Sequence, residues 1–129
     1  VKQGKKELIV NINIPKAFAN DNLERFEAEI IRAKEIAINT PEKGIIAALR
    51  GMKLRPDRTS IVKESPVPVL WITGKNDNYI DYNYIQSKAN LLKNGKLLTI
   101  ENVGHMGFIE EPMFSLKAIL SFFRYASEP

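Results

Sequence analysis

The stretch Val67-Pro68-Val69-Leu70-Trp71-Ile72-Thr73-Gly74-Lys75-Asn76-Asp77 decides how this chain folds. Its first seven residues form an apolar run of strand length, and polar residues follow from Lys75 onward. A strand that is apolar on both faces is typical of a buried parallel sheet. The proline at position 68 suits the start of such a strand, where its missing N–H costs least. Asp77 is then expected just after the carboxyl end of the strand.

A second apolar run, Leu97 to Ile100, leads into Asn102-Val103-Gly104-His105-Met106-Gly107. Between the two runs, the pattern predicts a helix over about residues 82–94, capped by Asp81 and ended by Gly95. Residues 67–101 therefore form one strand–helix–strand unit. Because the carboxyl ends of neighbouring parallel strands lie side by side, we expect Asp77 and His105 to meet, although they are 28 positions apart.

His105 is the only histidine in the chain, and it lies in a glycine-rich loop. Gly104 and Gly107 are expected to let the backbone turn sharply and to keep bulk away from the ring. Histidine suits proton transfer at neutral pH, and an aspartate bonded to Nδ1 fixes its tautomer and stabilises the imidazolium. The spacing predicts a catalytic pair of His105 and Asp77. The alternatives are a loop histidine bonded to a backbone carbonyl and a turn-capping aspartate.

These features resemble the closing third of the α/β-hydrolase fold. The resemblance covers about residues 66–125 and includes Gly104-His105, the run Glu110-Glu111-Pro112 and an amphipathic C-terminal helix. It implies an α/β fold class: a partial α/β-hydrolase fold, with the last two parallel strands, flanking helices and a helical lid segment. It implies a lid over residues 1–65 and core structure over 66–129. It also implies that Asp77 and His105 serve in the hydrolysis of an ester, lactone, epoxide or similar bond.

The nucleophile of that family precedes the acid and the histidine, in a Gly-x-Ser-x-Gly-like turn between a strand and a helix. None of the six serines has this context, and the chain has no cysteine. We therefore expect the lid and C-terminal part of a hydrolase, without its N-terminal half and inactive alone. The second hypothesis is a small non-enzymatic α/β binding or interaction module. A hydrogen bond between Asp77 and His105 discriminates, because only the enzyme requires it.

The first 65 residues are predicted to be mainly helical. Residues 7–14 alternate partly like a strand, whereas the resemblance places lid helix or loop there. Further helices are expected from Asn20-Asp21 to Ile38 and from Thr40-Pro41-Glu42 onward, packed on each other and over the carboxyl edge of the sheet. The second of these has an apolar face made of Ile45, Ala48, Leu49 and Met52.

Four apolar residues are candidates for lining a substrate pocket, although such residues are as often ordinary packing: Phe18, Met52, Met106 and Phe108. Trp71 is expected in the core. The last helix is predicted to open at Pro112, with Glu110 and Glu111 as favourable charge at its N-terminus. Its predicted core stripe contains Leu116, Ile119, Leu120 and Phe123.

Composition narrows the remaining function classes. The chain is 44% hydrophobic and 26% charged with a formal net charge of +4, and it has no apolar run of the ~20 residues that span a bilayer. The basic clusters at Lys2, Lys5 and Lys6 and at 53–63 lack interleaved aromatics, so we expect solvated surface and no nucleic-acid or membrane partner. We expect no metal, no cofactor and a cytoplasmic location. Self-association is predicted through the edge of the first strand or the lid helices, because a two-stranded sheet is marginal alone.

Overall fold

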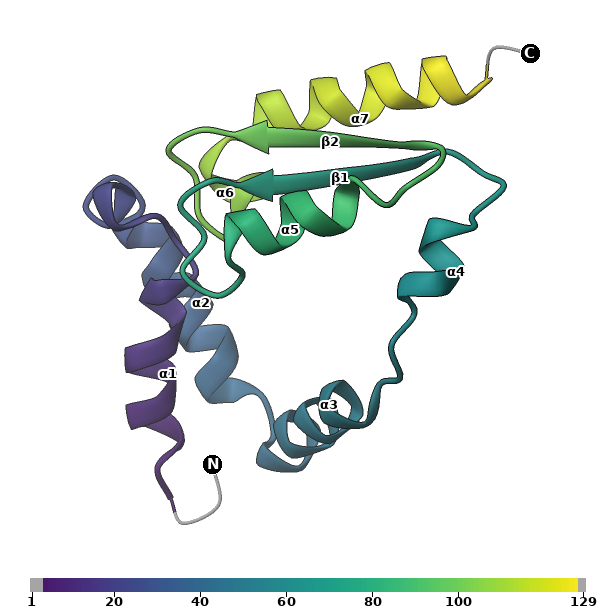
Figure 1. Cartoon of the computed structure of the whole chain (residues 1–129). Coiled ribbons are helices and arrows are strands. Elements are labelled where there is room, and N and C mark those ends of the chain that lie inside the picture. The colour runs from purple at the N-terminus through teal and green to yellow at the C-terminus, as the bar shows by residue number, and fades with distance from the viewer. Residues whose placement is uncertain (1–3, 128–129) are drawn as a thin grey trace.

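The computed structural model describes residues 4–127, and Lys2 of the first basic cluster lies outside them. A helical arm precedes a small α/β unit, in which helices lie on both sides of two strands (Figure 1). The helices are α1 (Lys6–Lys16), a 3-10 turn (Asn20–Asn22), α2 (Glu27–Asn39), α3 (Glu42–Leu54), α4 (Thr59–Lys63), α5 (Tyr82–Ala89), α6 (Gly107–Glu110) and α7 (Pro112–Ser127). No helix within residues 4–127 has the length and apolarity needed to cross a bilayer.

The two strands, β1 (Val69–Gly74) and β2 (Gly95–Ile100), are parallel and pair from Val69 with Gly95 to Gly74 with Ile100. The connecting helix α5 lies on one face and α7 on the other (Figure 1). This confirms the predicted α/β class, with two parallel strands and flanking helices. Asp81 caps α5 as expected, because its side chain accepts a hydrogen bond of 2.9 Å from the N–H of Tyr84.

The predicted end of α5 was wrong. The helix stops at Ala89, and the N–H groups of Leu91 and Leu92 bond back to residues 88 and 89 in a tight turn. Gly95 does not cap the helix but begins β2. A side chain there would collide with Leu92, since a Cβ built on Gly95 lies 2.5 Å from the Leu92 Cβ.

The N-terminal segment, which the sequence left open between strand, helix and loop, forms helix α1. The predicted start of the following helix was wrong. Helix α2 begins at Glu27, not at Asn20 or Asp21, and no side chain caps it. The reason is tertiary: the Asn22 side chain bonds to the carbonyl of Asn102, 80 positions away. The α1–α2 connection (residues 17–26) therefore contains only a 3-10 turn and does not continue α2 toward its N-terminus.

Helix α3 does not pack as predicted. Leu49 and Met52 on its apolar face are 54% and 69% exposed, and no residue of α3 is buried. Helix α2 packs instead against α1. Pro41 occupies the N-cap position of α3, while the Thr40 hydroxyl donates to the carbonyl of Ile36 and closes α2.

The buried core is small and lies where the helical arm meets the end of β2. Phe18, Phe26 and Ile30 form its centre, and the partly buried side chains packed on them are Ile14, Ala17, Met106 and Ile109. The predicted core stripe of α7 is not buried: its four members are between 38% and 64% exposed. Trp71 is only half-buried. Amphipathic faces of the chain thus remain uncovered within residues 4–127.

Replacing Asp81 by alanine removes the only side-chain acceptor at the start of α5. We expect the free energy of unfolding to fall by about 0.5–2 kcal/mol, as for other lost N-caps. Urea denaturation followed by circular dichroism measures this. Asn83→Ala, at an exposed position in the same helix, is the matched control, and an equal loss in both variants would contradict the capping role.

Candidate active site

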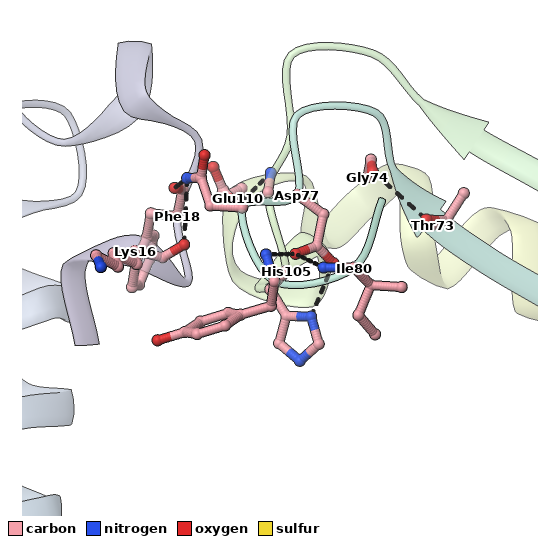
Figure 2. A network of polar contacts seen from close by, with 11 residues as sticks. Lys16, Phe18, Thr73, Gly74, Asp77, Ile80, His105 and Glu110 are labelled. Carbon is pink, nitrogen blue, oxygen red and sulfur yellow. Dashed lines mark hydrogen bonds and ion pairs between the residues drawn. The ribbon is translucent and has the colours of Figure 1, made fainter. Parts of the chain in front are cut away.

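Asp77 and His105 meet at the carboxyl ends of β1 and β2. The His105 Nδ1 lies 2.8 Å from Oδ2 of Asp77 (Figure 2). The Asp77 side chain is only 6% exposed, whereas that of His105 is 44% exposed. A carboxylate only accepts hydrogen bonds, so this contact favours a hydrogen on Nδ1 of His105. The hydrogen bond that the enzyme hypothesis requires, and to which the binding-module hypothesis is indifferent, is thus present.

The other oxygen of Asp77 caps the turn that follows β1. Oδ1 accepts hydrogen bonds from the N–H groups of Tyr79 at 2.7 Å and Ile80 at 3.1 Å. Asp77 therefore caps this turn, as the alternative interpretation expected, while its other oxygen contacts His105. Backbone donors on one oxygen fix the carboxylate plane and aim the other oxygen at the ring.

The residues after Asp77 attach its loop to the helical arm. Nδ2 of Asn78 lies 3.1 Å from the carbonyl of Phe18 and 3.2 Å from that of Lys16. The Tyr79 hydroxyl donates to the carbonyl of Asn13 at 2.6 Å, and its ring meets the His105 ring edge-on with centroids 5.6 Å apart. Burial, and secondarily the charge of Asp77, raises the pKa of the Tyr79 phenol. Tyr79 therefore remains a neutral donor at physiological pH.

Gly104 is required by a close approach and not by the sharp turn that the sequence suggested. The residue with a left-handed backbone in this loop is Asn102, at φ 54°. A Cβ on Gly104 would lie 2.5 Å from the backbone nitrogen of Ala19. The peptide before His105 thus lies directly on the α1–α2 connection, and the Met106 N–H donates to the carbonyl of Ala17 at 3.0 Å.

Glu110 has a different role from the predicted favourable charge near the last helix. Its side chain is 1% exposed. Oε2 accepts from the N–H of Ala19 at 3.0 Å and from Nδ2 of Asn22 at 2.7 Å, and Oε1 accepts from the N–H of Gly104 at 2.8 Å. Figure 2 shows this carboxylate beside the Asp77–His105 pair. The local sequence offers only a weak signal for it, an acid directly after the apolar Phe108 and Ile109.

The four predicted pocket residues do not gather in one place. A cavity of about 540 Å³ is lined by Asp77, His105 and Phe108, together with apolar residues of β1 and α7. Phe18 is fully buried in the core, where Met106 packs on it. Met52 lines a separate cavity of about 530 Å³. Of the four, the structure brings only Phe108 to the same cavity as the pair.

Ser115 lines the same cavity, but its hydroxyl donates to the carbonyl of Gly107 at 3.2 Å. Within residues 4–127, the one hydrogen bond of the His105 side chain is that to Asp77. No three His, Asp or Glu side chains in that range converge as metal ligands do.

Gly104→Ala is expected to lower the free energy of unfolding by about 1–3 kcal/mol, because the added methyl collides with backbone that is itself packed. Chemical denaturation measures the change. The matched control is Gly51→Ala in α3, where a Cβ meets no atom within 4 Å. There alanine is expected to stabilise by up to about 1 kcal/mol through helix propensity. Similar destabilisation in both variants would count against the close approach.

A family described as TAP-like protein matches residues 49–129, which is more than half of the chain. No curated protein sequence matches. Among solved structures, an esterase from Thermogutta terrifontis superposes with a TM-score of 0.90 at 21% identity, covering 98% of this chain and 46% of the esterase.

Two further structures share the fold. The enol-lactonase from Burkholderia xenovorans LB400 has a TM-score of 0.85 at 16% identity. The match covers 95% of this chain and 46% of the lactonase chain. The bromoperoxidase from Bacillus anthracis has a TM-score of 0.80 at 17% identity, with 94% and 45% covered. The chain thus spans less than half the length of the enzymes that it resembles. The matched residues and the shared fold place the chain in the TAP-like family of α/β-hydrolases.

Proposed function

We propose that Asp77 and His105 are the acid and the general base of a hydrolase that cleaves a carboxylic ester, lactone or similar bond. The observation that carries the proposal is the 2.8 Å contact between Nδ1 of His105 and a nearly buried carboxylate. Membership in the α/β-hydrolases supports it. The esterase and the enol-lactonase among the similar structures support an ester or lactone substrate.

In this proposal, Nε2 of His105 takes the proton of a hydroxyl nucleophile as the oxygen attacks the substrate carbonyl. Asp77 keeps the N–H on Nδ1 and stabilises the imidazolium that forms. The imidazolium then gives this proton to the alkoxide as the C–O bond of the ester breaks, which leaves an acylated nucleophile and a neutral His105. A water that loses its proton to the same Nε2 next attacks the acyl carbonyl. The carboxylic acid leaves, and the nucleophile takes the proton back from His105. The 44% exposure of the His105 side chain leaves the ring open to a nucleophile on the side away from Asp77.

The nucleophile is proposed to come from a polypeptide outside the described residues. In the esterase and the enol-lactonase, 54% of the chain has no counterpart here, because 46% is covered. One edge of β1 pairs with β2, and the cavity that Asp77 and His105 open onto runs along β1 past Leu70 and Ile72. We propose that further parallel strands pair along β1 and carry the nucleophile to His105, with residues 1–65 as the lid. Phe108, which lines the cavity of the pair, is the proposed substrate contact.

The binding-module hypothesis gains no specific support. It is indifferent to whether Asp77 and His105 meet, whereas their hydrogen bond is short and buried on the acid side. Self-association through the β1 edge or the helices of the arm, and a cytoplasmic location, stay predictions. Sedimentation over a wide range of concentrations tests the first, and a monomer throughout would contradict it.

The chain alone is expected to hydrolyse ethyl butyrate, an unactivated ester that a free imidazole does not attack appreciably, no faster than its His105→Ala variant, because a general base without a positioned nucleophile gives little acceleration. Initial rates at pH 8 measure this. A rate clearly above that of His105→Ala would show that the chain is active by itself and would overturn the proposed division of the site.

The positive test uses the longer protein obtained by extending the reading frame upstream of Val1, if the gene encodes a Gly-x-Ser-x-Gly-like turn there. In that protein, Asp77→Asn is expected to lower kcat by about 10⁴, because the imidazole is then held in the wrong tautomer. Asp81→Asn is the matched control, since Asp81 caps α5 and does not contact His105. Equal effects of the two substitutions would contradict the role of Asp77.

A further inference from the structure

The Glu110 carboxylate is the most deeply buried charged group of the described chain, and it lies next to the loop of His105. All of its hydrogen-bond partners are neutral donors, two from the α1–α2 connection and one from the peptide that precedes His105. Its partner Ala19 is 91 positions away in sequence. A buried carboxylate is costly unless its oxygens are satisfied, so these donors must stay in place for the fold to tolerate it.

The Gly104 N–H is the informative partner, because Gly104 is covalently joined to His105. Gly104 has no side chain, and its backbone lies against Ala19 closely enough to exclude a Cβ. The contact with Glu110 therefore fixes the position and orientation of the Gly104 N–H group, one residue before His105. Asn78 and Tyr79 attach the Asp77 loop to the same helical arm.

We propose that Glu110 is a positioning residue for His105. Its carboxylate holds the Gly104 peptide against the α1–α2 connection, so that Nδ1 of His105 stays in register with Asp77. This inference rests on the proposed function for its catalytic meaning. It goes beyond it by assigning a role to a residue that touches neither the ring nor the cavity, and by making the α1–α2 connection part of the support of the site.

A carboxylate suits this position better than an amide. It only accepts, and here three donors converge on its two oxygens, whereas a glutamine must turn its NH₂ toward one of them. In Glu110→Gln, the remaining oxygen is expected to stay with Ala19 and Asn22, which supply two donors. The NH₂ group then faces the Gly104 N–H, which loses its acceptor while the arm remains attached.

The test reads the tautomer of His105 in the full chain. Nitrogen-15 NMR of histidine-labelled protein at a pH where the ring is neutral distinguishes N–H on Nδ1 from N–H on Nε2. Because His105 is the only histidine, its signals need no assignment. Hydrogen exchange of the Gly104 and Ala19 amides is measured in the same samples. The variants are Glu110→Gln and Asn22→Ala, with Glu111→Gln as matched control and Asp77→Asn as positive control.

In the wild type and in Glu111→Gln, the hydrogen is expected on Nδ1. In Glu110→Gln, the Nδ1–H population is expected to fall toward that of Asp77→Asn, and the Gly104 amide is expected to exchange about tenfold faster or more while the Ala19 amide changes little. Asn22→Ala, which removes one donor and keeps the carboxylate, is expected to shift the tautomer in the same direction by less. If Glu110→Gln does not fold, Asn22→Ala carries the test.

The failures are distinguishable. A wild-type tautomer in every folded variant at positions 110 and 22, with a clear loss in Asp77→Asn, overturns the positioning role and leaves the proposed function intact. Glu110 is then only a stabilising residue, even if the variants melt at lower temperature. A wild-type tautomer in Asp77→Asn shows instead that Asp77 does not set the tautomer. That result overturns the proposed pair, and with it the role of Glu110.

Discussion

The arrangement of this chain depends on one crossing, where the peptide before His105 lies on the α1–α2 connection and the Glu110 carboxylate joins them. Two conditions make the crossing possible. Gly104 has no side chain, so two backbones can approach within contact distance. Glu110 offers two oxygens to donors that the crossing would otherwise bury unpaired. Loss of either condition affects the helical arm and the histidine loop together, because they share these contacts.

The local part of this arrangement can be predicted from the sequence. An apolar run of strand length, a capped helix and a second run define one parallel unit, and parallel geometry alone brings Asp77 and His105 to the same edge. The prediction succeeded because each step uses neighbours in the chain. The predicted start of α2 and the predicted role of Glu110 were wrong for the opposite reason. Asn22 and Glu110 take their positions from hydrogen bonds to partners 80 to 91 positions away in the chain. No local sequence pattern encodes such contacts.

A second group of wrong predictions concerns which apolar side chains are buried. Periodicity correctly marks an apolar face on α3 and on α7, and both helices form. Periodicity predicts which face of a helix is apolar, but not whether another part of the protein packs on that face. Leu49 and Leu116 are about half exposed, at 54% and 48%. The same applies to Trp71 in β1, which a fully flanked strand would bury and which here is only half-buried. These surfaces agree with a chain that spans less than half of the enzymes that it resembles.

The predicted division at Ser65 separates lid from core by sequence, whereas the contacts divide the chain differently. Phe18 and Phe26 of the helical arm share one core with Met106 and Ile109 of the histidine loop. Helix α3, equally part of the predicted lid, buries no residue. Motion of α3 can therefore leave the Asp77–His105 geometry unchanged, whereas motion of α1 and the connection after it cannot, because Asn78, Tyr79 and Glu110 all bond to that segment. Helix α1 and the connection after it support the loops of Asp77 and His105, whereas no residue of α3 is buried.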